Sequence, residues 1–243
     1  AVNPRFMLSL ARRALKKGTS EEARREAGKR EFRAMSRGVR VLSRLQLPPD
    51  LMARLNPSSH PDRDEAPDLI FYTGCNMLKT PHIGLLCLDT LDALGVSYEV
   101  YGGPANCCGV LQWRPGDDAN AGRQAYKTIE RFAETKTSEV LSWCPTCQIE
   151  FSENALPNIS RNEQPVFDMT MFASYLARRL DDLKPLMTNP VRKRVALHEH
   201  SGGLGVADAV KRVLSEIEGL EIVDLDMPNV GYAITALRAV PDY

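Results

Sequence analysis

The chain has 243 residues, 43% of them hydrophobic, which is enough for a buried core in one or two domains. Its six cysteines are too few and too clustered for the disulfide framework of a small secreted protein. No run of the sequence approaches the roughly 18 apolar residues of a membrane span, and we expect no secretory signal. These features predict reduced thiols, a cytoplasmic protein and no membrane span.

The net charge of zero hides an uneven distribution of charge. Residues 1–66 contain 15 Lys and Arg against 8 Asp and Glu, whereas the remainder contains 16 against 23. The pattern from Phe6 to Leu45 predicts helix, with a break and a new N-cap within Gly18–Glu22, and a further short helix is predicted from Pro48–Asp50. We expect residues 1–66 to form a basic helical arm that docks on the body or on a partner. Interspersed acidic residues and the lack of an aromatic series argue against nucleic acid.

The body that follows alternates short apolar runs with helical periodicity. Strands are predicted at Asp68–Tyr72, Val96–Tyr101 and Glu139–Trp143, and helices between them at Thr80–Leu94 and Asp118–Lys136. This βαβαβ order predicts an α/β fold in which a parallel sheet is connected by right-handed crossovers.

Five of the six cysteines follow the predicted strands at their carboxyl ends, where ligands bind in open α/β sheets. Thirty-one residues separate the first from an adjacent pair, and thirty-five separate that pair from a CxxC motif; they are Cys75, Cys107, Cys108, Cys144 and Cys147. Thiolates gathered on loops suit zinc or an iron–sulfur cluster. Adjacent cysteines cannot easily reach two corners of one tetrahedron, so the pattern favours iron and sulfide.

Other interpretations of the cysteines stay open at this point. A structural zinc site would use four of them, and a thiol–disulfide oxidoreductase would use Cys144 and Cys147 alone. Cys87 lies on the apolar face of a predicted helix, which indicates a buried structural thiol.

A second β-α-β pattern begins after Pro190. Arg194–Gly202 resembles the strand and loop that lead to Cys75, Val206–Ile217 has helical periodicity, and Leu220–Asp226 resembles the second strand. Pro228–Ala233 then falls where the cysteine pair stood, at a shift of 124 residues. We expect a repeat of the first half, whose third strand would lie beyond Tyr243 or come from a partner.

This second repeat lacks the cysteines of the first. Ser201 stands in the place of Cys75, and Gly231 and Tyr232 stand in the place of the cysteine pair. If the two repeats face one another, His200 could donate a proton to a thiolate near the cysteines, and His198 is a weaker candidate for that role.

The frame of single cysteine, Cys-Cys-Gly and CxxC closely resembles the cysteine-rich CCG domain found in the B-type subunit of heterodisulfide reductase. The resemblance is strong over Asp68–Ala155 and weak over Arg194–Ala233. It implies one noncubane four-iron four-sulfur cluster per chain, held by the cysteines Cys75, Cys107, Cys108, Cys144 and Cys147. One intact repeat, one degenerate repeat and a basic arm are most similar to the second B-type subunit of the heterodisulfide reductase-like complex of sulfur-oxidising prokaryotes.

The resemblance implies a function and partners as well as a cofactor. It implies an oxidoreductase subunit, active within a complex, that transfers electrons to or from thiol, disulfide or protein-bound sulfur. Its partners would be C-type ferredoxin-like and flavin-containing A-type subunits and a lipoyl-bearing carrier protein; a scaffold of such a complex is the alternative. The fold expected is α/β with two pseudo-repeated βαβ-type halves and short parallel sheets, divided into an arm (1–66), a cluster-binding domain (67–190) and a degenerate second repeat (191–243).

Overall fold

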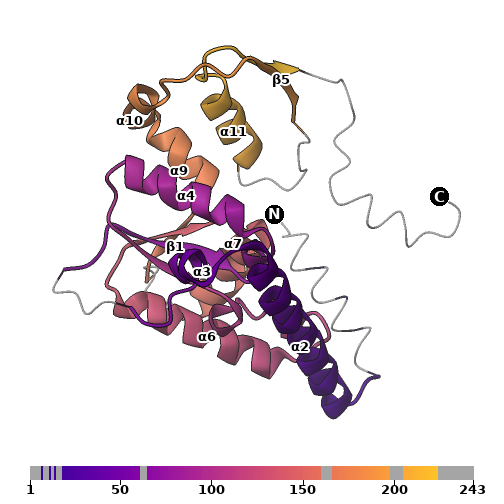
Figure 1. The fold of residues 1–243 in the computed structure, drawn as a ribbon. Coiled ribbons are helices and arrows are strands. Elements are labelled where there is room, and N and C mark those ends of the chain that lie inside the picture. The colour runs from indigo at the N-terminus through magenta and orange to yellow at the C-terminus, as the bar shows by residue number, and fades with distance from the viewer. Residues whose placement is uncertain are drawn as a thin grey trace, which may run out of the picture. The chain divides into compact units, whose positions relative to one another are not determined.

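The structure, a computed structural model, divides into two compact units, residues 1–170 and 171–243 (Figure 1). It describes residues 18–60, 65–159, 166–197 and 205–223, together with Met7, Ala11 and Ala14. The division of the chain into three parts at residues 66 and 190 remains a prediction.

The first unit is built around a four-stranded sheet with the strand order β2-β1-β3-β4. Its strands are β1 (Leu69–Gly74), β2 (Tyr98–Gly102), β3 (Glu139–Ser142) and β4 (Asp168–Met171). Strand β1 pairs in parallel with both β2 and β3. The three strands predicted from the sequence are therefore present, within one to two residues at most ends, and β4 is an addition to them.

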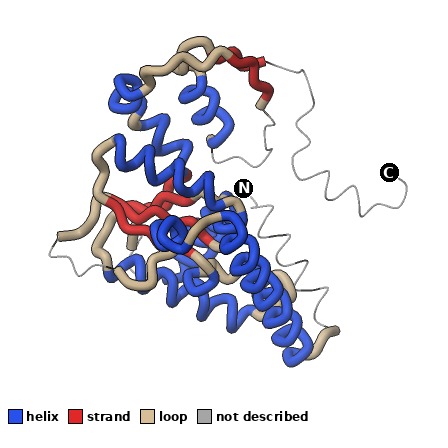
Figure 2. The backbone as a smooth tube through the Cα atoms, in the orientation of Figure 1, coloured by secondary structure: helices blue, strands red, loops and turns tan. Residues whose placement is uncertain are grey.

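Helices α4 (Pro81–Ala93) and α6 (Asp118–Glu134) lie on opposite sides of this sheet (Figures 1 and 2). From β1 the chain runs through α4 to β2, which lies next to β1 on one side. From β2 it runs through α6 to β3, which lies next to β1 on the other side. Right-handed crossovers in opposite directions place their helices on opposite faces. The strand order therefore reverses between β1 and β3, the position at which open α/β sheets form a ligand crevice.

Aromatic side chains fill the core between the sheet and α6. Phe132 of α6 lies with its ring centroid 5.3 Å from that of Tyr72 on β1, 5.4 Å from that of Tyr101 on β2, and 5.6 Å from that of Phe167. Phe151 lies 5.7 Å from Tyr72 by the same measure. Edge-to-face packing at these distances is favourable beyond the area that it buries, so the strand that precedes Cys75 rests on a rigid base.

Helix α2 (Glu21–Gln46) confirms the helix and the new N-cap predicted for the arm. The hydroxyl of Ser20 accepts a hydrogen bond from the Ala23 N–H at 3.2 Å, which satisfies one free donor of the first turn. The helix packs against α5 (Val110–Trp113) and the 3₁₀ turn η1 (Met77–Lys79). A side chain at Gly28 would come within 3.1 Å of Asp117 Oδ2, so the small residue permits this close approach.

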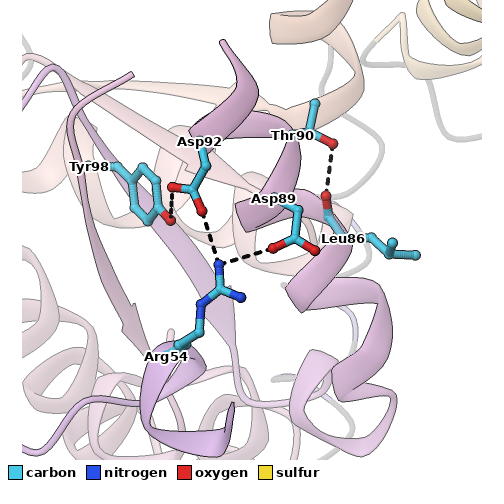
Figure 3. A network of polar contacts seen from close by, with 6 residues as sticks. All are labelled: Arg54, Leu86, Asp89, Thr90, Asp92 and Tyr98. Carbon is cyan, nitrogen blue, oxygen red and sulfur yellow. Dashed lines mark hydrogen bonds and ion pairs between the residues drawn. The ribbon is translucent and has the colours of Figure 1, made fainter. Parts of the chain in front are cut away.

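The short helix α3 (Pro49–Leu55), also expected from the sequence, is joined to α4 by an ionic network (Figure 3). Arg54 contacts Asp89 Oδ1 and Asp92 Oδ2, each at 3.0 Å. Asp92 also accepts a hydrogen bond of 2.7 Å from the Tyr98 hydroxyl, which links the network to β2. Because these groups are partly exposed, the network contributes little free energy of unfolding, on the order of 1 kcal/mol or less per pair.

The second unit contains helices at its start and a two-stranded parallel ladder. Its described elements are α9 (Phe172–Arg178), α10 (Leu180–Leu183), η4 (Lys184–Leu186), β5 (Lys193–Ala196), α11 (Val206–Leu214) and β6 (Leu220–Val223). Among the residues that the structure describes, no helix is long and apolar enough to cross a membrane.

The pairing register of the two ladders supports the repeat. Leu69 lies six residues before Cys75 and pairs with Tyr98, which lies six residues before Pro104. The corresponding residues of the second repeat are Val195, six before Ser201, and Ile222, six before Pro228, and these two also pair. The fold class expected from the sequence, two βαβ-type halves with short parallel sheets and helices at the N-terminal side, is confirmed.

Candidate metal centre

The structure brings the five predicted cysteines together at the carboxyl ends of three strands. Cys75 follows β1 directly, the pair follows β2 through the 3₁₀ turn η2 (Pro104–Asn106), and the CxxC motif follows β3. The thiols form a continuous series of side-chain contacts in the order Cys75, Cys107, Cys108, Cys147 and Cys144. All five are free thiols.

The series of thiols passes from the surface into the core. Cys75 and Cys144, at its two ends, are partly exposed, whereas the three thiols between them are buried. Within the described ranges, no three His, Cys, Asp or Glu side chains are placed as a group to hold one metal ion. Five sulfur donors in one contact series are more than the four ligands that a tetrahedral zinc ion takes.

The thiols perturb one another's ionisation strongly. Hydrogen bonds from Cys107 and Cys147 lower the pKa of Cys108 to about 5, and a hydrogen bond from Cys147 lowers that of Cys144 to about 6. The donors show the complementary effect: a hydrogen bond to Cys108 raises the pKa of Cys107 to about 12, and that of Cys147 lies well above its usual range. Hydrogen bonding to Cys107 and burial also raise the pKa of Cys75. Two of the five thiols, Cys108 and Cys144, therefore favour the thiolate, and the other three would release their protons on binding a metal.

The residue before Cys75 lets the first loop approach the last one. Gly74 has φ +61°, and a Cβ atom at this position would lie 3.3 Å from Cys147 Sγ. A residue with a side chain would be strained in this left-handed conformation and would crowd the sulfur atom. Glycine thus keeps the loop after β1 in contact with the CxxC motif.

The glycine that follows the cysteine pair has an even stricter role. Gly109 has φ +87°, and a Cβ atom there would lie 2.4 Å from the carbonyl oxygen of Ala121 in α6. The backbone after the pair therefore crosses α6 at van der Waals distance. Only glycine supplies both this conformation and this clearance, which explains the Cys-Cys-Gly sequence in steric terms.

One face of α6 holds the loop that carries the cysteine pair. Gln124 Nε2 and Arg131 Nη1 each donate a hydrogen bond of 3.1 Å to the carbonyl oxygen of Ala105. The Thr128 hydroxyl donates one of 3.1 Å to the carbonyl oxygen of Cys107. These three side chains lie at positions i, i+4 and i+7, which share one face of a helix, so the loop is fixed along two turns of α6.

Tyr72 supports the same loop from beneath. Its hydroxyl donates a hydrogen bond of 2.7 Å to the carbonyl oxygen of Asn106. The Asn106 side chain in turn donates to the Gly102 carbonyl at 2.8 Å and accepts from Arg131 at 2.7 Å. Complete burial raises the pKa of Tyr72 well above its ordinary value, and the nearby cysteine thiols add to this effect. The phenol therefore stays protonated and acts as a donor.

The CxxC motif opens the helix α7 (Pro145–Ile149), as the sequence predicts. Cys144 is the N-cap, Pro145 occupies the first turn, and the backbone N–H groups of Thr146 and Cys147 donate to the Cys144 thiol. Donors at a helix N-terminus favour the thiolate. These backbone donors add to the hydrogen bond from the Cys147 thiol, the largest cause, in lowering the pKa of Cys144 in spite of burial.

Of the remaining predicted residues, the structure describes Cys87 alone. Cys87 lies on α4 and is buried, and burial alone raises its pKa to about 12, in accord with a structural thiol. His198, His200, Ser201, Gly231 and Tyr232 lie outside the described residues, so the proton-donor role of His200 stays a prediction.

The sequence interpretation missed the residues that position the thiols. These are Tyr72, Asn106, Gln124, Thr128 and Arg131. The polar residues of α6 at i, i+4 and i+7 were the available signal, although this pattern is also typical of a solvated helix face.

Comparison with known proteins agrees with this geometry. Residues 69–152 match the family of the cysteine-rich CCG domain. No solved structure matches the chain.

Two curated relatives are the D subunits of dihydromethanophenazine:CoB–CoM heterodisulfide reductase from two archaeal species. The chain is 28% identical to that of Methanosarcina mazei over an alignment of 173 residues, which covers 67% of this chain and 41% of the relative. It is 26% identical to that of Methanosarcina barkeri with the same coverage of 67% and 41%. The match thus spans about two fifths of the length of these relatives. Residues 69–152 are thus similar to the cysteine-rich CCG domain, in a chain that is similar to the D subunit of heterodisulfide reductase.

Proposed function

We propose that the chain is an iron–sulfur subunit of a heterodisulfide reductase-like complex that acts on thiol or disulfide groups. The observation that carries this proposal is the contact series of five thiols at the strand-order reversal between β1 and β3. The similarity to the D subunit of a heterodisulfide reductase supports the same reaction class.

The residues that would hold the cluster are Cys75, Cys107, Cys108, Cys144 and Cys147, and we propose the noncubane four-iron four-sulfur type, one per chain. The fit rests on the donor set and its surroundings. Three of the thiols are buried, and thiolates are the usual ligands of iron–sulfur clusters. The adjacent pair can bind different iron atoms, because neighbouring residues cannot easily occupy two corners of one metal. When bound, such a cluster supplies one-electron transfer and an iron atom with affinity for sulfur.

The protein's own groups would control this centre in three ways. The amides at the start of α7 lie against Cys144 and stabilise negative charge there. Tyr72 and the face of α6 fix the position of the cysteine pair. The buried side of the site excludes water, whereas the partly exposed side of Cys75 and Cys144 leaves a direction of approach for an electron donor or a substrate.

The biological setting proposed is sulfur metabolism in the cytoplasm. The second B-type subunit of the sulfur-oxidising heterodisulfide reductase-like complex is the assignment that we favour, because the chain combines one cysteine-bearing repeat, one repeat without these cysteines and a basic arm. Its partners would be C-type and A-type subunits and a lipoyl-bearing carrier protein. His200 remains the candidate proton donor from the second repeat.

Iron and sulfide analysis of anaerobically purified protein tests the proposal. We expect acid-labile sulfide, several irons per chain and a visible absorption spectrum, and we expect Cys107→Ser to lower iron and sulfide together. Cys87→Ser is the matched control, since Cys87 is buried on α4 and contacts none of the five thiols that we assign. Colourless protein with one zinc, or iron content unchanged by Cys107→Ser, would contradict the proposal.

A further inference from the structure

A cavity of about 270 Å³ opens beside the cysteine pair, between α6 and the segment that follows the CxxC motif. Cys108 and Gly109 form part of its wall. Its volume is slightly below the range of about 300–1,000 Å³ that is typical of small-molecule sites. The space therefore suits a short chain rather than a large cofactor.

The backbone itself creates the cavity. On the side of α6, the wall includes the small residues Ala121, Gly122 and Ala125 as well as Asp118 and Tyr126, and a Cβ atom at Gly122 would meet nothing within 4 Å. The facing wall comes from the π-helix η3 (Glu150–Ala155) and the turn α8 (Leu156–Ile159). The wider turns of a π-helix displace side chains from α-helical positions and are frequent at functional sites. Small residues facing a π-helix leave room that ordinary packing would fill.

The polar groups around this cavity are oxygen-rich and acidic. Glu150, Asn154 and Asn158 contribute from one wall and Asp118 from the other. Asn154 Nδ2 donates to Glu150 Oε2 at 3.0 Å, which orients the carboxyl group. None of the described residues that line the cavity is Lys, Arg or His.

Charges just outside the cavity do not reverse this character. Burial is the largest influence on the pKa of Glu150 and leaves it above its ordinary value; the hydrogen bond from Asn154 and the charge of Arg114 lower that pKa, and Glu153 raises it. An anionic ligand would therefore meet the acidic side chains Glu150 and Asp118, and like charges at a binding site are disfavoured. A neutral group that donates hydrogen bonds, or a cation, would instead find acceptors.

We propose that this cavity binds the sulfur-bearing end of a short aliphatic thiol or disulfide that is neutral or cationic, and that it selects against anionic thiols. The proposal rests on the function proposed above and names its substrate class. Ala121, Gly122 and Ala125 would contact the aliphatic chain, and Glu150, Asn154 and Asn158 would recognise its polar end. Cys108 marks the end of the cavity at which the sulfur would meet the metal centre.

Three small thiols of similar size test the charge preference on the cluster-bearing protein: cysteamine, 2-mercaptoethanol and mercaptoacetate. Binding is followed by the change in the visible and electron paramagnetic resonance spectra. We expect cysteamine and 2-mercaptoethanol to bind at least about tenfold more tightly than mercaptoacetate, a ratio that corresponds to about 1.4 kcal/mol. Glu150→Gln should reduce the difference in affinity between mercaptoacetate and the other two thiols. Equal binding of all three thiols would overturn the proposal.

A filled cavity tests the location of the site. Gly122→Leu places a side chain into the cavity and should weaken thiol binding at least about tenfold, equivalent to about 1.4 kcal/mol, with iron and sulfide unchanged. Gly38→Leu is the matched control, because Gly38 also lies in a helix, α2, and a Cβ atom there meets nothing within 4 Å. Unchanged binding in Gly122→Leu would place the thiol elsewhere and overturn the proposal.

A measurement on the metal-free full chain separates this proposal from the function on which it rests. Methanethiosulfonate reagents with aminoethyl, methyl and sulfonatoethyl groups transfer these groups to a thiolate as a disulfide, and methanesulfinate leaves. After correction for their reactivity with free cysteine, we expect the sulfonatoethyl reagent to modify Cys108 most slowly, and Gly122→Leu to slow all three. The absence of iron would refute only the proposed function, whereas an unchanged rate in Gly122→Leu would refute only the cavity proposal.

Discussion

The first and second β-α-β ladders of this chain share a pairing register but differ in how they are buried. All six positions of β1 are buried, whereas in β5 only Val195 is partly buried and its neighbours are exposed. The register pairs Leu69 with Tyr98 in the first and Val195 with Ile222 in the second. A shared pairing register is therefore not sufficient to form a metal centre. The first ladder adds a core on both faces of the sheet and side chains that hold its loops.

The largest expected difference between the two ladders concerns their equivalent strand residues. Leu69→Ala removes a side chain that is 1% exposed and should lower the free energy of unfolding by about 2–5 kcal/mol. Val195→Ala, at the equivalent position of β5, should cost less than about 1 kcal/mol because Val195 is only partly buried. Chemical denaturation of both variants measures the difference, and equal losses would show that the second ladder is as well packed as the first.

Glycines with a positive φ angle provide a second comparison between the two ladders. Gly109→Ala should cost more than about 2 kcal/mol and lower the iron content, because strain at φ +87° adds to a 2.4 Å overlap with the Ala121 carbonyl. Gly205→Ala, at φ +64° before α11, meets nothing within 4 Å and should cost only about 1 kcal/mol, from backbone strain alone. Thermal unfolding and iron analysis report both effects. A fully iron-loaded Gly109→Ala protein would refute the crossing of this loop over α6.

The cysteine-pair loop supplies a smaller and more specific effect. Tyr72→Phe removes the donor to the buried Asn106 carbonyl and should cost about 1–3 kcal/mol. Tyr98→Phe is the control, since the Tyr98 hydroxyl bonds to Asp92 near the surface and leaves the loop untouched. Slower iron incorporation in Tyr72→Phe than in Tyr98→Phe would locate the effect in the loop. Equal rates would mean that the hydrogen bond contributes stability alone.

The smallest effect is expected at the surface of the first unit. Arg54→Ala removes both contacts of the network in Figure 3 and should lower the free energy of unfolding by less than about 1 kcal/mol, because the partners are exposed. The loss should shrink at high salt, which screens such charges. Iron content should not change. Denaturation at two ionic strengths is the measurement, and a loss that is independent of salt would point to packing of the Arg54 side chain instead.

Local sequence patterns predict the elements of the first sheet well. The helices α4 and α6 begin and end within about two residues of the predicted bounds, because their apolar spacing and terminal residues are encoded locally. The convergence of Cys75, Cys107 and Cys144 also follows from strand order alone. Strand β4 and the π-helix η3 were not predicted, since β4 is short and depends on its pairing with β3, and a π-turn has no distinct periodicity in the sequence.

The support of the site is harder to predict than its cysteines. Tyr72 carries the pattern of any buried strand residue, and its hydrogen bond to Asn106 depends on two strands that are separated by a helix. The contacts of Gln124, Thr128 and Arg131 with the loop before Cys108 are equally long-range. Side-chain chemistry identifies the donors, but only the tertiary fold identifies their acceptors.

The attachment of the cysteine-pair loop to α6 has a consequence for the order of events during synthesis. The chain emerges from its N-terminal end, so Cys107 and Cys108 are made before Gln124, Thr128 and Arg131, the three residues that hold their loop. A nascent chain that ends before α6 presents the cysteine pair without its support. A cluster delivered at that stage would meet a cysteine pair in many conformations and would lack Cys144 and Cys147, so the complete site exists only after α6 and the CxxC motif have both emerged.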